Sequence, residues 1–375
     1  MEIPDILVSW GHRLFVILPF ACIIILEKYL RHRRFVKLTG CQPAYSKAPV
    51  KDPLIGLDFI YDKLFRGLPE KGLKDSCQTF DKLGSTYTVS RWTAQVIYTC
   101  DAGNVRHMLA TGFEDFGLPK IRKSALTSLL GTGIFSLDGV PWSHARAVLR
   151  PTLTKKKMHD LPAMLEHHAQ ALLHRIPMDG TVFDLQPLFF GFTMDVSTDV
   201  FMGRSTGMLG SDKQPKRENQ FIDDYLLCSE EVIKKMNLGP LGHFRWNTAA
   251  DHAKENVFKY VDDYIDESLK LHLENPQTGC NFMQEMAAAV GDRKALRDQV
   301  LHFLLASRDT TATLLSNLFF VLAKKPLVYS KLREEILHAV GEETPAFDRL
   351  KDIKYLKWCV NECKSMWALF SHLPG

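Results

Sequence analysis

One long stretch without helix-breaking residues limits the folds that this chain can adopt. Residues 296–323 contain no glycine and no proline. Glycine and proline are the residues that most strongly disfavour a helix interior, and globular helices average only about 11–12 residues. We therefore expect one unusually long helix that crosses a whole domain.

A polar segment, residues 306–312 (ASRDTTA), interrupts the apolar sequence of this predicted helix. Burying an acid and hydroxyl groups is costly unless they are paired or used, although serine and threonine can bond to the carbonyl one turn back. An acid followed directly by threonine in mid-helix suits a proton relay beside a ligand that lies along the helix. Asp309 and Thr310 are therefore our candidate catalytic residues.

The rest of the body has mainly helical spacing of its apolar residues. Residues 86–91 and 95–99 alternate β-branched or aromatic residues with polar ones, which predicts a β-hairpin. Asp101 is placed to cap a helix that follows it. Further helices are expected at 158–176, 185–201, 219–235, 252–273 and 326–340. The predicted fold class is mainly α, with a small β-sheet toward the N-terminal side.

The N-terminal segment predicts a membrane anchor. Residues 14–26 (LFVILPFACIIIL) are apolar and uncharged, and their neighbours extend the run toward the roughly 20 residues of a membrane-spanning helix. Acids precede the run and basic residues follow it, the reverse of a cleavable signal peptide. We expect residues 1–38 to form an uncleaved anchor with its basic flank, and the positive-inside rule places the body in the cytosol. Residues 39–56, with three prolines and two glycines, are expected to be a linker.

Charge and cysteine content exclude several classes of protein. The net charge is +4, and five basic residues against one acid within residues 27–37 account for it. The body is close to neutral, so we expect no nucleic-acid partner. The eight cysteines include no C-x-x-C pair, which predicts reduced thiols rather than disulfides or zinc ligands.

Two weaker motifs are interpreted as structural. Glu335 and His338 have the spacing of a di-iron bundle site, but that chemistry needs a second copy, which the sequence lacks. Residues 131–133 (GTG) are a fragment of a glycine loop without the third glycine and the later acid of a dinucleotide site.

Four segments together resemble one enzyme family. Residues 306–312 are similar to the A-G-x-D-T-T motif of the cytochrome P-450 monooxygenases, and residues 133–146 (GIFSLDGVPWSHAR) resemble the approach to that family's W-x-x-x-R helix. Residues 192–203 and 355–363 resemble two further core helices. The sequences GIFSLDG and FTMDVSTD most closely resemble those of the fungal branch of the family that hydroxylates alkanes and fatty acids.

The resemblance implies a cytochrome P-450-like helical fold that binds haem b. It implies that Trp142 and Arg146 hold a haem propionate and that Glu362 has a structural role in the E-x-x-R pair. The implied reaction inserts one oxygen atom from O2 into a small hydrophobic substrate of the fatty-acid or alkane class. Electrons come from NADPH through a flavoprotein reductase, at the endoplasmic reticulum membrane, with a single-pass anchor. Residues 236–244 lie where the resemblance implies the family's membrane-dipping loop; an ordinary surface loop with glycine and proline turns is the alternative.

The chain departs from the family near residue 364. Position 365 is serine where the family has arginine, residues 364–375 no longer resemble the family, and no cysteine has the surroundings of the haem loop F-x-x-G-x-R-x-C-x-G. We expect a partial cytochrome P-450 domain at 57–363, truncated at its C-terminus, with 364–375 as an unrelated tail and no axial cysteine for the metal. We also expect an inactive chain in which Glu362 is a buried carboxylate without its partner.

Two explanations of this departure stay open. Either the sequence leaves its reading frame near Lys364, or the truncated protein is real and has no monooxygenase activity. In the second case the chain is a non-catalytic membrane-anchored remnant that acts only as a binding or interaction protein. The haem content of the purified chain distinguishes the two functions.

Overall fold

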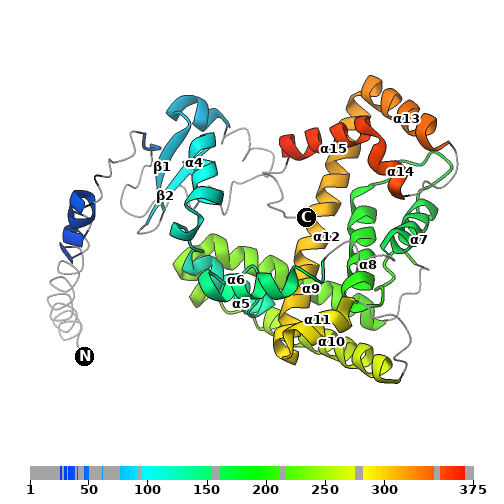
Figure 1. Cartoon of the computed structure of the whole chain (residues 1–375), viewed down its shortest axis with the longest axis horizontal. Helices are drawn as coiled ribbons and strands as arrows, with labels where there is room; N and C mark the ends of the chain where they lie inside the picture. The colour runs from blue at the N-terminus through cyan, green and yellow to red at the C-terminus, as the bar shows by residue number, and fades with distance from the viewer. Residues whose placement is uncertain are drawn as a thin grey trace, which may run out of the picture.

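The computed structural model describes residues 77–91, 94–153, 161–210, 216–274, 282–341 and 347–367, with short stretches between residues 26 and 61. Most of the described chain is helical, which confirms the mainly α fold (Figure 1). Among these residues, no helix is both long enough and apolar enough to cross a bilayer. The predicted anchor run at 14–26 lies outside the described residues except for Leu26.

The predicted hairpin is confirmed and pairs β1 (Thr86–Arg91) with β2 (Ala94–Thr99) in antiparallel register. Tyr87 and Tyr98 face each other across the pair and stack with their ring centroids 5.3 Å apart. Asp101 caps α4 (Ala102–Arg106) as expected, because its side chain accepts from the Asn104 amide at 2.8 Å. Beyond α4 the predicted helix widens into a π-helical turn, η2 (His107–Thr111).

The long helix is confirmed as α12 (Arg293–Lys324), which has 32 residues. It is capped by Asp292, whose carboxylate accepts from the Ala295 amide at 2.8 Å. The helix α8 (Gln186–Met202) runs along α12, and α7 (Leu161–His174) packs on α8. Figure 1 shows α12 extending from a lower group of helices to an upper group. The upper group is α13 (Pro326–Val340), α14 (Phe347–Asp352) and α15 (Lys354–Trp367).

Two hydrophobic clusters hold these helices together. The larger one joins α8 and α12 to α5 (Lys120–Leu130), α9 (Lys216–Leu238), α10 (Thr248–Glu274) and α11 (Phe282–Val290). Its fully buried side chains include Leu130, Met194, Ile265 and Leu301, each of which stabilises the fold by roughly 1.5–3 kcal/mol. A smaller cluster, around Leu322, lies between the end of α12, α13 and α15.

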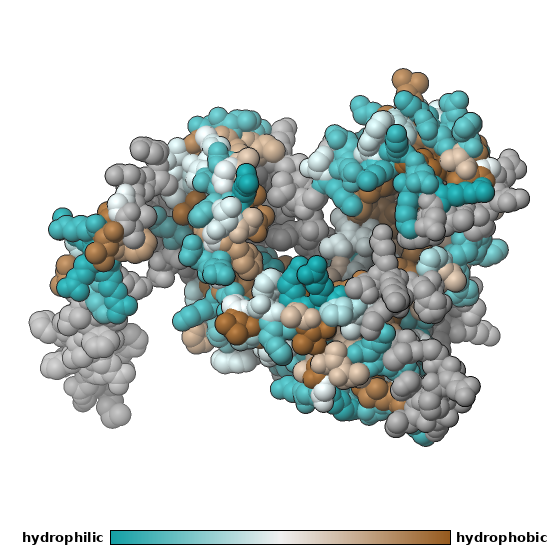
Figure 2. All heavy atoms as spheres, viewed as in Figure 1, coloured by the Kyte–Doolittle hydropathy of each residue, from teal (hydrophilic) through white to brown (hydrophobic). Residues whose placement is uncertain are grey.

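The surface is largely hydrophilic, with separate hydrophobic patches, on the face that Figure 2 shows. The segment 236–244, predicted to be a membrane-dipping loop, finishes α9 and then forms the 3₁₀-helix η4 (Gly239–Phe244). Leu241 is 49% exposed, Phe244 70% and the nearby Trp246 85%. Membrane contact by this segment stays a prediction.

Candidate functional site

The polar segment of α12 contains a buried ion pair between sequence neighbours. Arg308 Nη1 lies 2.6 Å from Asp309 Oδ1, and the two side chains are only 8% and 10% exposed. The guanidinium also lies over the ring of Phe190 on α8, 4.8 Å from its centroid. Burial raises the pKa of Asp309, and the Arg308 guanidinium opposes that rise. Arg308 therefore supports a charge on Asp309 in surroundings that water does not reach.

Thr310 lies on the exposed side of the same helix. Its hydroxyl donates to the carbonyl of Ala306 at 2.7 Å, which is the local bond that helical threonines commonly make. Because Asp309 pairs with Arg308 instead, the structure places the two predicted relay residues side by side without a direct hydrogen bond. Their catalytic role stays a prediction.

Tyr225 is a further ionisable group near this pair that our sequence analysis missed. It belongs to α9 and is fully buried in the main core. Burial and the Asp309 charge raise the pKa of the phenol, whereas the Arg308 charge lowers it. The phenol therefore stays neutral and lies within electrostatic reach of both charges. No sequence signal marks it, because a core tyrosine on an amphipathic helix looks like any other apolar position.

The second predicted pair lies on α6 (Gly139–Leu149). The Arg146 guanidinium lies 5.5 Å from the ring centroid of Trp142, and Phe113 contacts the same indole at 5.4 Å between centroids. Arg146 is exposed, and among the described residues it makes no ion pair. An unpaired guanidinium with its fork of donors beside an aromatic ring is well suited to hold a carboxylate of a ligand.

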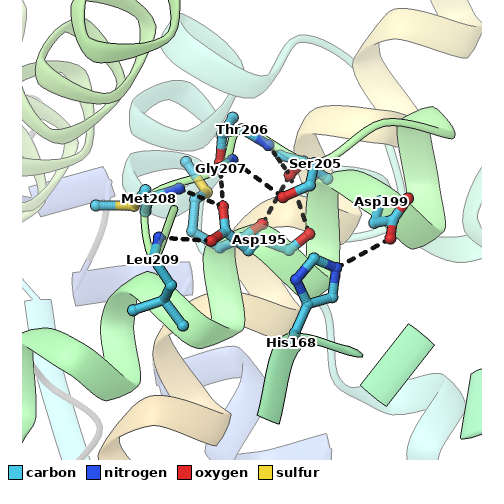
Figure 3. Close-up of polar contacts among 10 residues, drawn as sticks. His168, Asp195, Asp199, Ser205, Thr206, Gly207, Met208 and Leu209 are labelled. Carbon is cyan, nitrogen blue, oxygen red and sulfur yellow. Dashed lines mark hydrogen bonds and ion pairs between the residues drawn. The ribbon is translucent and has the colours of Figure 1, made fainter. Parts of the chain in front are cut away.

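The FTMDVSTD segment forms the centre of α8 and holds a loop onto it (Figure 3). Asp195, only 1% exposed, accepts from the Thr206 hydroxyl at 2.9 Å and from the amides of Met208 and Leu209 at 2.7 and 2.9 Å. One turn later, Asp199 pairs with His168 of α7 at 2.9 Å. These two aspartates are therefore structural, and they fix α7 and the 203–210 loop to the helix beside α12.

Comparison with known proteins decides the family. The sequence pattern described as cytochrome P450 matches residues 57–363. The chain belongs to the cytochrome P450 family. It is 34% identical over 357 residues to cytochrome P450 monooxygenase fsdH of Fusarium heterosporum, which covers 90% of this chain and 62% of that protein. It is 37% identical over 295 residues to cytochrome P450 52A4 of Candida maltosa, covering 74% and 54%.

The match to cytochrome P450 52A3-B of Candida maltosa is longer, with 33% identity over 372 residues that cover 93% of this chain and 69% of that protein. The family assignment confirms the resemblance inferred from the α12 segment and the α6 pair. The chain spans about three fifths of the length of the first curated relatives that it matches.

Haem-thiolate chemistry in cytochromes P450 depends on a cysteine thiolate as axial ligand. The five described cysteines are free thiols. Cys228 lies in the main core with its sulfur 3.6 Å from the Ala250 carbonyl, and burial raises its pKa to about 11. Burial likewise raises the pKa of Cys359 and Cys363 on α15. The exposed Arg146 on α6 thus suits a haem propionate, whereas the surroundings of Cys228, Cys359 and Cys363 do not suit an axial thiolate.

Glu362 corrects one of our expectations. Instead of being buried without a partner, it lies exposed on α15, and the Ser365 hydroxyl bonds to its backbone carbonyl at 2.8 Å. An exposed carboxylate keeps its hydration, so the energetic cost expected for an unpaired buried charge does not arise here. The structural role assigned to Glu362 by the family resemblance stays a prediction.

Proposed function

We propose that this chain is the larger part of a membrane-associated haem-thiolate monooxygenase that inserts one oxygen atom from O2 into a fatty acid or alkane. The observation that carries the proposal is the α6 pair, in which the exposed Arg146 guanidinium has no ion pair among the described residues and lies over Trp142. Family membership and the fungal relatives support it. The proposed substrate class rests on the resemblance of the segments GIFSLDG and FTMDVSTD to the fungal alkane and fatty-acid hydroxylases.

The proposed organisation follows the sequence. Residues 1–38 anchor the chain in the endoplasmic reticulum membrane, 39–56 link the anchor to the body, 57–363 form the cytochrome P450 domain, and 364–375 are an unrelated tail. The body faces the cytosol, where a flavoprotein reductase passes electrons from NADPH. The exposed Leu241, Phe244 and Trp246 support a second contact with the membrane.

Each task that the family resemblance implies is assigned to side chains whose surroundings suit it. When bound, haem supplies the oxygen chemistry, and Trp142 and Arg146 hold one of its carboxylates. Asp309 and Thr310 serve the proton relay: the Asp309 carboxylate pairs with Arg308 in the core, and Thr310 presents a hydroxyl on the exposed side of α12. Transfer between Asp309 and Thr310 needs the Arg308 pair to open first, because the carboxylate is engaged there.

We further propose that residues 1–375 on their own have no monooxygenase activity. A thiolate is the required iron ligand, and the protonated thiols of Cys228 and Cys363 face backbone carbonyls at 3.6 and 3.9 Å. Cysteines with pKa values raised by burial are poor ligands because the thiolate form is scarce.

Haem titration of the purified chain tests these proposals. We expect weak haem binding without the strongly red-shifted Soret band of a thiolate complex in the reduced, carbon-monoxide-bound state. Arg146→Gln should weaken haem binding about tenfold, the loss expected for one charged hydrogen bond. Arg150→Gln, at the C-terminal cap of the same helix and also exposed, is the matched control and should bind as the unaltered chain does.

Three outcomes are decisive. A strongly red-shifted band would show thiolate ligation by a cysteine of this chain and would overturn the inactivity proposal. Equal haem affinity of Arg146→Gln and Arg150→Gln would overturn the propionate site. Complete absence of haem binding would favour the non-catalytic interaction protein instead.

A further inference from the structure

The turn formed by residues 131–136, which begins with GTG, lies directly on α12. Three backbone amides of residues 131–136 donate to side chains on one face of that helix. The Thr132 amide donates to the Asp298 carboxylate at 2.8 Å, and the Phe135 amide donates to His302 Nδ1 at 3.1 Å. Between them the Ile134 amide donates to Gln299 at 3.3 Å.

The two glycines of the turn make this close approach possible. Gly131 has a φ of +67°, and a Cβ on it would lie 2.2 Å from the Asp298 carboxylate. A Cβ on Gly133 would lie 2.4 Å from Cδ2 of His302. Side-chain atoms never approach so closely, so only glycine brings the turn within hydrogen-bond distance of α12.

The turn leads straight into α6, which carries Trp142 and Arg146. Ser136 closes the turn by donating to the Gly131 carbonyl at 3.0 Å. Asp138 then caps α6 and accepts from the Leu118 amide at 2.8 Å, which ties the start of α6 to the start of α5. The start of α6 is thus held from two sides, by α12 through the turn and by the segment before α5 through Asp138.

His302 is the most deeply buried of the three α12 contacts. It is fully buried, and its ring stacks on Phe135 with 5.6 Å between centroids and 19° between planes. Burial lowers the pKa of His302 to about 4, so the ring is neutral near pH 7. The bond from Phe135 assigns Nδ1 as the acceptor, so Nε2 carries the proton.

We propose that His302 is a positioning residue for the α6 site: by accepting the Phe135 amide it fixes the turn on α12 and thereby the orientation of Trp142 and Arg146. The haem role of Trp142 and Arg146 rests on the proposed function, but the positioning of α6 does not. The contact joins residues 167 positions apart, so it couples the α6 pair to the helix that carries Asp309 and Thr310.

Two matched variants test the role of the acceptor. His302→Asn keeps an oxygen acceptor at the δ position, whereas His302→Leu has the same branching without an acceptor. Both lose the ring, so their difference isolates the hydrogen bond. The measurement is amide hydrogen exchange, followed by mass spectrometry, in peptides covering 131–138 and α6, with α10 as an internal reference.

We expect α6 amides to exchange about tenfold faster in His302→Leu than in His302→Asn, while α10 exchanges equally in both. Gly133→Ala, which displaces the ring sterically, should reproduce the effect of His302→Leu. Equal exchange of α6 in the Asn and Leu variants would overturn the proposal, and so would faster exchange confined to 131–138.

The test also separates this proposal from the proposed function. Haem titration of Arg146→Gln examines the ligand, whereas hydrogen exchange of the haem-free chain examines the positioning. If His302→Leu loosens α6 and Arg146→Gln leaves haem binding unchanged, the positioning stands and the haem role of α6 fails. If α6 stays protected in His302→Leu and Arg146→Gln weakens haem binding, the haem role of α6 stands and the positioning role of His302 fails.

Discussion

Arg308 and Asp309 are neighbours in the sequence and partners in the structure, with 2.6 Å between Nη1 and Oδ1 inside the core. Adjacent side chains on a helix normally point in different directions. Here the guanidinium lies over Phe190 of α8, and the carboxylate bends toward it. Arg308 therefore favours the charged form of Asp309 against the burial that raises the pKa of this carboxyl, and any proton exchange with Thr310 depends on opening this pair.

Replacing Arg308 should destabilise the chain through Asp309. In Arg308→Gln the carboxylate stays buried without its partner, and breaking a buried pair costs roughly 3–5 kcal/mol. The pKa of Asp309 is already raised by burial and should rise further in this variant. The loss of unfolding free energy should therefore be largest at neutral pH and should shrink as the pH falls, because protonation removes the buried charge. Urea unfolding at several pH values measures it.

The double variant Arg308→Gln/Asp309→Asn is the key comparison, because it removes both charges and should recover most of the lost stability. Lys234→Gln breaks an exposed pair with Glu230 and should cost less than about 1 kcal/mol. Equal instability of the single and double variants would contradict the role of the buried charge.

The stability of the chain should depend on His302 at acidic pH. Its pKa in the folded chain is about 4, below the ordinary value of 6.5. Between these values the unfolded chain binds a proton that the folded chain does not, so stability present above pH 6.5 is lost as the pH falls toward 4. The full loss is about 3 kcal/mol.

His302→Asn removes this titration, so the difference in unfolding free energy between it and the unaltered chain should shrink from pH 7 to pH 4. His252→Asn is the comparison at a surface histidine, because the His252 side chain is 80% exposed. Parallel profiles for the unaltered chain and His302→Asn would refute the assignment of His302 as a neutral acceptor.

Asp195 should be essential to the loop that it holds. An asparagine has a single oxygen acceptor, so Asp195→Asn leaves at least one of the three donors without a partner, at a cost of roughly 1–3 kcal/mol. Asp179→Asn is the matched control, since exposed Asp179 accepts a comparable loop bond from the Thr181 amide at 2.9 Å. Thermal unfolding compares them, and equal melting temperatures would contradict the prediction.

The exposed side chains of η4 should bind lipid surfaces. For a chain lacking residues 1–38, Leu241→Asp with Phe244→Asp should reduce co-sedimentation with phospholipid vesicles, because apolar burial drives interfacial binding. Leu238→Asp with Leu241→Asp should act in the same direction. Asp substitutions at Leu327 and Tyr329, exposed on α13, are the control. Unchanged sedimentation of both double variants would leave residues 236–244 an ordinary surface turn.

The elements of this fold were predictable where local signals are strong. The hairpin followed from the alternation of residue types at 86–91 and 95–99. The helix α12 followed from 28 residues without a helix breaker, and the structure adds only a few residues at its N-terminal end, after the Asp292 cap. The π-helical turn after Arg106 was not predicted. The i→i+5 hydrogen bonds of a π-helical turn leave no recognisable pattern in the sequence, because they depend on how the turn packs.

The candidate site was predictable as a set of residues and not as an arrangement. The resemblance of the α6 motif predicted that Trp142 and Arg146 hold a haem propionate, which stays a prediction. The structure places the Arg146 guanidinium 5.5 Å from the centroid of the Trp142 ring. The α12 motif predicted Asp309 and Thr310 as relay residues, which stays a prediction. In the structure Asp309 bonds to Arg308 and Thr310 to Ala306. Which side chain the Asp309 carboxylate bonds to depends on the helices packed around it, here α8.

The sequence by itself determined the hairpin, the longer helices and the family, because periodicity, caps and motifs are encoded within a few residues of one another. Only the tertiary structure decided that Glu362 is exposed and that the GTG turn bonds to α12. The physical reason is distance along the chain. Phe135 meets His302 across 167 positions, and whether a charge or an amide is buried depends on packing between segments that the local pattern does not specify.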